Sequence, residues 1–215
     1  GTVSSVYFPE RDAVKLVNTP TSDIFDADIT EPVKVSFYNG TKVIDALSHF
    51  NGDVKGRIKY AEYDGEMMAS DFILENEDLQ INLACTDPSL SFMEMSKEET
   101  DRAFDTTSRM FDFDLLTTHV DKMKSLFNLD KDEDVFTLYI GEKGINVKGT
   151  SYDATLCHSY DSDVEKGSKV VIYKKYINLL DKENYKVSVC ENKVVFKSLD
   201  TNTHLTVAVA ITDED

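Results

Sequence analysis

The chain repeats one order of predicted elements three times: a strand, a short helix and three further strands. Alternating apolar and polar residues predict the strands, and apolar residues three and four positions apart predict the helices. The three copies occupy residues 32–84, 109–159 and 169–211. One unit of this size cannot bury its own apolar face, so two units are expected to pack side by side. Their strands then form sheets on one side, and their helices pack on the other.

The predicted helices are Thr41–Phe50, Asp114–Phe127 and Lys174–Asp181. Each has an apolar face opposite a more polar one, as in the middle helix, where Val120 and Met123 lie on one side. Glycines stand where turns are needed between the strands that follow.

The beginning of the chain predicts the last three strands of a fourth copy, at Val3–Phe8, Ala13–Val17 and Asp23–Ile29. The first strand and the helix of that copy are missing, and by analogy with the other units they need roughly 20 residues. We therefore expect the natural protein to continue upstream of Gly1.

Four repeat units taken in pairs predict an α+β protein with two domains, residues 1–85 and 109–215. Residues 86–108 are polar and acidic and have no clear periodicity. Such a length is unusual for a structureless loop inside one domain, so this segment is interpreted as a connector between the two domains.

Charge separates the helices from the rest of the chain. The sequence holds 40 acidic and 23 basic residues, a net charge of −17. An acidic surface maintains solubility, and it argues against a domain that reads DNA sequence, which normally shows a basic footprint. Residues 41–50, 114–127 and 174–182 nevertheless carry six lysines against four aspartates. The acidic excess therefore lies outside the predicted helices.

Several kinds of site lack their sequence requirements. Asp130–Asp134 begins like a calcium loop, but Val135 and Gly141 occupy the positions that need glycine and glutamate. No two of the four histidines have zinc-ligand spacing, and no nucleophile, phosphate-loop or metalloprotease motif occurs. We therefore predict no metal, no cofactor and no catalytic residue. A carboxylate dyad formed in space, as in a hydrolase, stays open as an alternative.

Cysteine usage and hydropathy point to an intracellular protein. Cys85, Cys157 and Cys190 are odd in number and lie in or beside apolar runs, so buried free thiols are expected. No apolar stretch approaches the length of about 18 residues that a membrane span needs, and the first residues contain no secretory signal.

In order and pattern, the chain resembles the sliding-clamp family, with the clamps of T-even-type phages as the nearest match. The likeness covers nearly the whole chain and is carried by five segments. These are YNGTKVIDALSHFNGDVKGRIKYAEYDGEMMASDF, ACTDPSLSF, DFDLLTTHVDKMKSLF, FTLYIGEKGINVKG and KKYINLLDKENYKVSVCENKVVF, the last followed by HLTVAVAI.

The resemblance implies a DNA-clamp fold in which each domain has outer antiparallel sheets and inner helices. It also implies a homotrimeric ring that encircles double-stranded DNA without reading its sequence. Such a ring tethers a DNA polymerase, is loaded by a clamp-loader ATPase and works in the cytoplasm, or in the host cytoplasm if a phage encodes it. The rival interpretation is a non-catalytic β-rich structural or adaptor protein of a virion.

Seven residues on the polar faces of the helices are predicted to line the DNA channel: Lys42, His49, Lys122, Lys124, Lys174, Lys175 and Lys182. A sparse basic lining tolerates phosphates without binding them tightly. The alternative is that these are ordinary solvated side chains.

Six apolar residues are implied by the resemblance as a site for partner peptides near the connector and the final strand: Leu90, Phe92, Met93, Ala208, Ala210 and Ile211. The alternative for each is that it only fixes the connector or the strand to the core.

Overall fold

A computed structural model of the chain describes residues 2–10, 12–20, 22, 35–37, 41–87 and 96–210. The chain divides into two compact units: a larger one of residues 1–28 and 95–215 and a smaller one of residues 29–94. These units are defined by contacts within each, whereas the predicted domain boundaries at residues 85 and 109 follow the repeat order. Those boundaries remain a prediction.

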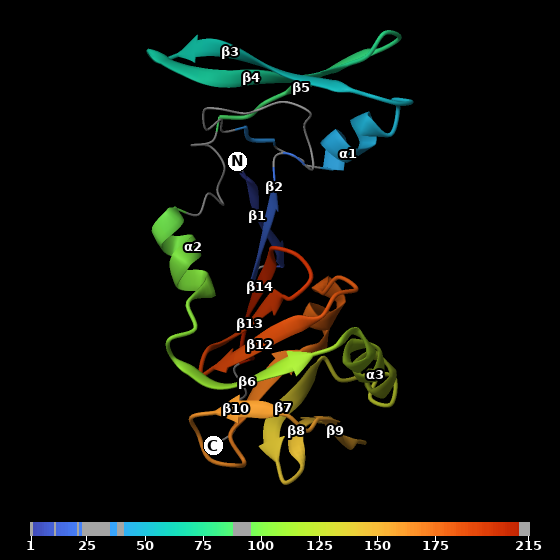
Figure 1. Cartoon of the computed structure of the whole chain (residues 1–215), viewed down its shortest axis with the longest axis vertical. Coiled ribbons are helices and arrows are strands. Elements are labelled where there is room, and N and C mark those ends of the chain that lie inside the picture. The colour runs from blue at the N-terminus through green and yellow to red at the C-terminus, as the bar shows by residue number, and fades with distance from the viewer. Residues whose placement is uncertain are drawn as a thin grey trace. The chain divides into compact units, whose positions relative to one another are not determined.

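The larger unit contains a seven-stranded antiparallel sheet with the order β1-β2-β14-β13-β12-β6-β10 (Figure 1). Its strands are β1 (Thr2–Glu10), β2 (Ala13–Pro20), β6 (Arg109–Leu115), β10 (Tyr160–Ser162), β12 (Tyr185–Cys190), β13 (Lys193–Ser198) and β14 (Thr203–Ala208). The pairing of β2 with β14 brings strands from the two ends of the sequence side by side.

A second antiparallel sheet in this unit has the order β11-β7-β8-β9. Its strands are β7 (Val135–Gly141), β8 (Gly144–Lys148), β9 (Asp153–Cys157) and β11 (Lys169–Tyr173). The two repeats exchange their first strands: β6 pairs with β12 of the following repeat, and β11 pairs with β7 of the preceding one. Neither repeat therefore completes its sheet alone.

One apolar core joins the two sheets of the larger unit to its helices. Helix α3 (Thr117–Phe127) buries Val120 and Met123, and the 3-10 helix η3 (Lys174–Leu179) buries Tyr176 and Ile177. The two helices are in contact.

The helix boundaries differ from the sequence predictions in three places. Helix α3 begins at Thr117 rather than Asp114 because Asp114 and Leu115 extend β6 and pair with β12. The third predicted helix is a 3-10 turn that ends at Leu179, since the backbone becomes extended at Leu180. Helix α1 ends at Leu47 rather than Phe50.

The connector contains a helix that was not predicted from the sequence, α2 (Lys97–Phe104). By contrast, the sequence pattern predicts strands at Gly144–Lys148, Lys169–Tyr173, Tyr185–Cys190 and Lys193–Ser198, and these are the bounds of β8, β11, β12 and β13. The predicted strand Asp23–Ile29 lies outside the described residues. In the part of the chain that the structure describes, no helix is both long and apolar enough to cross a membrane.

The smaller unit combines helix α1 (Thr41–Leu47) with a three-stranded antiparallel sheet. The strands are β3 (Lys55–Tyr63), β4 (Glu66–Glu75) and β5 (Gln80–Ala84), in that order across the sheet. Ala46 of α1 packs with Phe50 and Leu74, and Phe72 and Leu83 lie against this cluster. The smaller unit thus has its own small core.

The turn between β7 and β8 gives a test of the packing. Gly144 has φ +140°, and a Cβ at this position would lie 2.0 Å from the carbonyl oxygen of Cys157. Gly144→Ala is expected to lower the free energy of unfolding by more than about 3 kcal/mol, because backbone strain adds to a clash with a neighbouring strand. Chemical denaturation measures this change.

Gly167→Ala is the matched control. Gly167 also has a positive φ, +95°, but no atom lies within 4 Å of the place that a Cβ would take. Only the backbone strain of about 1–2 kcal/mol is expected there. Equal losses in the two variants would contradict the close approach of β8 to β9.

Candidate functional site

Helix α3, η3 and the residues just after η3 carry five of the seven residues predicted to line a channel. Lys122 is exposed on α3, Lys124 is half-buried on the same helix, and Lys182 is exposed just after η3. The first turn of α3 is fixed by Thr117, whose N–H donates to the Asn184 side-chain oxygen at 3.1 Å. This hydrogen bond ties the start of α3 to the segment that follows η3 and contains Lys182.

Lys175 and Lys174 make contacts within the chain. The Lys175 ammonium pairs with Glu10 at 3.0 Å and lies 5.3 Å from the centre of the Tyr176 ring. Its hydrogen bond to Glu10 raises the pKa of Lys175. The Lys174 ammonium donates to the Asp130 carbonyl oxygen at 2.6 Å. Both lysines therefore hold the fold together on the side where the channel was predicted.

A further lysine of this region was missed from the sequence. Lys15 of β2 is 7% exposed, and its ammonium pairs with Asp181 at 2.6 Å and donates to the Leu179 carbonyl oxygen at 3.3 Å. The sequence contained a sign of this role, because Lys15 lies on the same strand face as the apolar residues Ala13 and Val17. A lysine on such a face needs an acidic partner.

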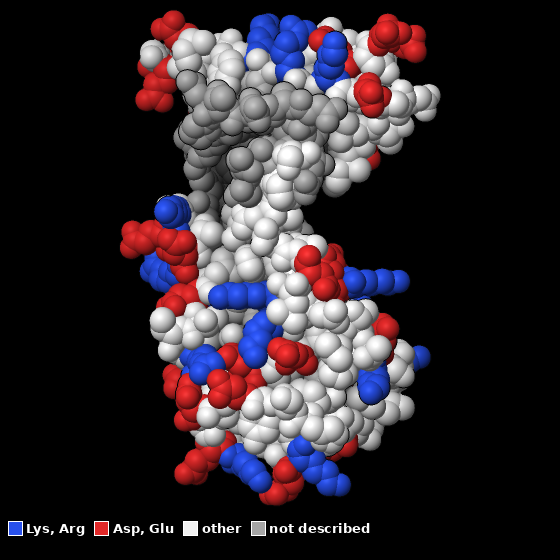
Figure 2. Space-filling view, viewed as in Figure 1, with Lys and Arg blue, Asp and Glu red and all other residues white. Residues whose placement is uncertain are grey.

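The remaining two predicted channel residues belong to the smaller unit. Lys42 lies on α1 and His49 in the turn after it, and both are exposed. Figure 2 shows further cations gathered over the sheet of the smaller unit and both signs of charge mixed over the larger one.

The second candidate site lies where α2 crosses the outer face of the seven-stranded sheet. Helix α2 begins with a capping box: the Glu99 N–H donates to the Ser96 hydroxyl at 3.1 Å, and the Ser96 N–H donates to the Glu99 carboxylate at 2.8 Å. These hydrogen bonds lower the pKa of Glu99. Since α2 buries none of its residues, its end caps and anchors hold it rather than an apolar face.

The C-terminal end of α2 is anchored to β13 and β14. The Lys193 ammonium donates to the carbonyl oxygens of Arg102 at 2.7 Å and Ala103 at 3.1 Å. The Thr206 hydroxyl donates to the Ala103 carbonyl oxygen at 2.9 Å. A lysine at this end also suits the helix dipole.

This anchoring explains why part of the outer face of the sheet is buried. Ser188, Val195 and Thr206 follow one another across β12, β13 and β14, and all are buried although they face away from the core. Lys197 of β13 and His204 of β14 are paired on the same face, two residues further along their strands. Both line a pocket. The connector thus covers one row and leaves the next one accessible.

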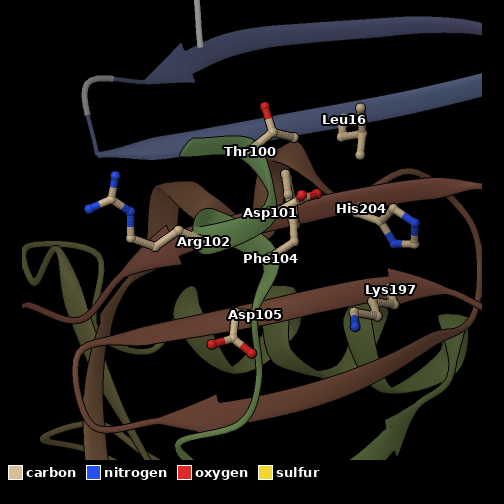
Figure 3. Close-up of a pocket in the computed structure, with 8 residues that line it drawn as sticks. All are labelled: Leu16, Thr100, Asp101, Arg102, Phe104, Asp105, Lys197 and His204. Atoms are coloured by element: carbon tan, nitrogen blue, oxygen red, sulfur yellow. The ribbon is translucent and has the colours of Figure 1, made fainter. Parts of the chain in front are cut away.

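The pocket beside α2 has a volume of about 610 Å³ (Figure 3). It is lined by Leu16, Thr100, Asp101, Arg102, Phe104, Asp105, Lys197 and His204. The Phe104 and His204 rings lie 5.9 Å apart. Apolar surface and charges of both signs suit this pocket to the side chains of a bound polypeptide.

The pocket only partly agrees with the predicted partner-binding residues. Leu90, Phe92, Met93 and Ile211 lie outside the described residues. Ala208 and Ala210 donate backbone hydrogen bonds to Asp12 and Val171, and Ala210 is buried. Leu16, Phe104 and His204 were not predicted from the sequence. The Ser96-x-x-Glu99 pattern could have predicted α2 and so directed attention to Phe104.

The loop Asp130–Asp134, which begins like a calcium loop in sequence, is held by contacts within the chain. The Asp130 carboxylate accepts the Ser151 N–H at 3.1 Å through both oxygens, and its carbonyl accepts Lys174. The Ser151 hydrogen bonds lower the pKa of Asp130. Among the described residues, no group of three His, Cys, Asp or Glu side chains could hold a metal ion.

Comparison with solved structures identifies the fold as that of DNA sliding clamps. The polymerase III β subunit of Pseudomonas aeruginosa superposes with a TM-score of 0.63 at 10% identity, over 100% of this chain and 56% of that one. The PCNA of Thermococcus kodakaraensis gives 0.60 at 11% identity, over 97% of this chain and 86% of that one. The predicted α+β clamp fold is confirmed.

A third similar structure is the β clamp of Helicobacter pylori bound to a DNA ligase peptide, with a TM-score of 0.59 at 12% identity. This chain spans little more than half the length of the bacterial clamps that it matches. No family model and no curated protein matches the sequence. Because the sequence identities are so low, the likeness establishes the fold alone.

The anchoring of α2 is testable through amide exchange. Thr206→Val removes one hydrogen bond to α2 while keeping the side-chain shape, a loss of about 1 kcal/mol. The amides of residues 97–104 are then expected to exchange about fivefold faster, because docking of α2 is weakened while the sheet persists. Thr137→Val on β7 is the control and leaves this exchange unchanged. Unaltered exchange in Thr206→Val would show that this contact does not hold α2.

The pocket also predicts a dependence on pH. Burial, followed by the nearby Lys197 charge, lowers the pKa of His204. The folded state therefore prefers neutral His204, and stability falls as the pH drops below about 6.5, where the unfolded histidine takes up a proton. NMR titration is expected to place the His204 pKa below that value, and Lys197→Ala is expected to raise it. A pKa above 6.5 in the folded protein would contradict the partial burial of His204 beside Phe104.

Proposed function

We propose that the chain is a sliding clamp that encircles double-stranded DNA and tethers a replicative DNA polymerase, thereby conferring processivity. The observation that carries this proposal is the clamp fold, which extends over 97% of the chain and 86% of an archaeal PCNA. A virion structural or adaptor protein is not favoured by the structures that this chain resembles. The function requires no catalytic residue and no cofactor.

The proposed assembly is a homotrimeric ring of two-domain subunits, with domains at residues 1–85 and 109–215 and a connector at 86–108. Edge strands of neighbouring subunits would pair and so remove each other's open edges. A separate clamp-loader ATPase would open the ring. We further propose that this clamp is of the T-even phage type and that it works in the cytoplasm of a host cell.

The channel lining proposed for this ring is sparse. Of the predicted channel lysines in the larger unit, Lys122 and Lys182 are exposed and Lys124 is half-buried, while Lys42 and His49 would contribute from the smaller unit. Each phosphate contact adds salt dependence and resistance to sliding, so few cations in an acidic protein suit a mobile ring. Lys175 would join them only by leaving Glu10.

The proposed partner site is the pocket beside α2, together with the connector residues Leu90, Phe92 and Met93 and the end of the chain at Ala208, Ala210 and Ile211. The Helicobacter pylori clamp was solved with a DNA ligase peptide, which supports peptide binding as a use of this fold. A short segment of the polymerase or of the loader is the proposed occupant.

Primer extension on a long template, with the polymerase and loader of the same replication system, tests the function. The chain is expected to lengthen the products. Lys122→Glu, Lys124→Glu and Lys182→Glu together are expected to abolish this effect, because phosphates are repelled from the lining. The matched control replaces Lys143, Lys148 and Lys166 with glutamate; these are exposed lysines on other segments. This control variant is expected to keep the activity.

Mass measurement accompanies the assay to establish that each protein forms the ring. The expected mass is three times the 24.3 kDa of this chain. An assembled trimer that leaves product length unchanged would exclude the clamp function. A trimer with full activity after the triple reversal would exclude these lysines from the lining. A stable monomer would favour the structural or adaptor alternative. An acidic-dyad hydrolase would instead show activity that depends on one pair of carboxylates.

A further inference from the structure

We propose that Lys174 is a positioning residue, which fixes η3 against the end of α3 and so sets the geometry of the lysines around it. This inference rests on the proposed function, because those lysines are the proposed channel lining. The sequence pattern places Lys174 on the polar face of a predicted helix and so predicts that it lines the channel. The proposal gives it a structural role instead.

The contacts of Lys174 all lead back to the segment that leaves α3. Its ammonium donates to the Asp130 carbonyl oxygen at 2.6 Å and lies 5.6 Å from the centre of the Phe127 ring. Its backbone N–H donates to the Asp134 carbonyl oxygen at 2.7 Å. One residue at the start of η3 thereby holds the last residue of α3 and both ends of the loop that follows.

The loop that receives Lys174 is itself held firmly. The Asp130 N–H donates to the Phe127 carbonyl oxygen at 3.2 Å, and the Asp130 carboxylate accepts the Ser151 N–H. Asp130 is 7% exposed. A Cβ at Gly149 would lie 2.3 Å from the Asp130 carboxylate, so glycine is needed for this approach. The loop is thus fixed from β8–β9 on one side and from η3 on the other.

The acidic run therefore binds an ammonium group of its own chain. The Asp130 carboxylate accepts a hydrogen bond from the Ser151 N–H, and the Asp130 carbonyl oxygen accepts one from the Lys174 ammonium. A phosphate contact would require the Lys174 ammonium to leave both this oxygen and the Phe127 ring, whose face attracts a cation. Lys122 differs, because it is exposed on α3.

The consequence concerns spacing along the proposed channel. Helix α3 belongs to one repeat and η3 to the next, so no short stretch of backbone sets their separation. Lys122 and Lys124 lie on the first element, and Lys182 follows the second. Lys174 joins the two, which places three proposed phosphate contacts on one rigid surface.

The experiment compares Lys174→Met with Lys122→Met in the full chain, since methionine keeps the apolar stem and removes the ammonium. Lys174→Met is expected to lower the Tm by about 4 °C or more, and Lys122→Met to leave it unchanged. Binding to a short labelled DNA duplex is measured across a range of salt concentrations. Lys122→Met is expected to reduce the salt slope by about 0.9, the value for one phosphate contact. Lys174→Met is expected to weaken binding at every salt concentration, because the remaining lysines are less well placed, and to leave the slope unaltered.

A rescue variant separates positioning from general stability. The amide resonances of Leu126 and Phe127, at the end of α3, are expected to shift in Lys174→Met and to return in Lys174→Arg, which can again donate to the Asp130 carbonyl oxygen. If Lys174→Met does not fold, recovery of the fold by Lys174→Arg supports the proposal, and failure of Lys174→Arg to restore these resonances overturns it.

The decisive contrary result is a Lys174→Met protein with an unchanged Tm and a salt slope reduced like that of Lys122→Met, because Lys174 would then contact phosphate. If the unaltered chain shows no salt-dependent association with DNA and also leaves product length unchanged in primer extension with the loader, the proposed function fails instead. The Tm and the resonances of α3 still decide the positioning role in that case.

Discussion

The exchange of first strands between neighbouring repeats is the constraint on which the larger unit depends. β6 adds to the sheet of the next repeat and β11 to that of the preceding one, so neither sheet forms without both repeats. Each exchanged strand leads directly into a helix, β6 into α3 and β11 into η3. The exchange therefore places α3 and η3 side by side, and with them the lysines proposed to line a channel.

Lysines in this molecule serve two different purposes. Lys174 donates to a backbone carbonyl oxygen in the loop after α3, and Lys15 and Lys193 donate to carbonyl oxygens at the ends of η3 and α2. Cations suit these positions because the last carbonyl oxygens of a helix lack partners within it. Lys122 and Lys182 are exposed instead. A count of lysines along a helix cannot distinguish structural from functional cations, since the partner of each comes from a distant segment.

The order of strands along the chain was largely predictable, because β8 and β12 alternate with a period of two and β11 and β13 are short apolar runs rich in β-branched residues. The helix boundaries were harder to predict. Asp114 and Leu115 fit a helical pattern, but pairing with β12 holds them in a strand. Helix α2 was missed because it buries no residue and so has no apolar periodicity, although its capping box was visible at Ser96 and Glu99.

The sequence by itself determined the repeat, the fold class and the separation of a few helix lysines from a strongly acidic remainder, because these depend on local periodicity and residue type. Only the tertiary structure decided which repeat each first strand joins, that Lys174 binds Asp130, and that α2 crosses β13 and β14 beside a pocket. These features join residues far apart in the chain. They depend on which surfaces meet, and no local pattern encodes that.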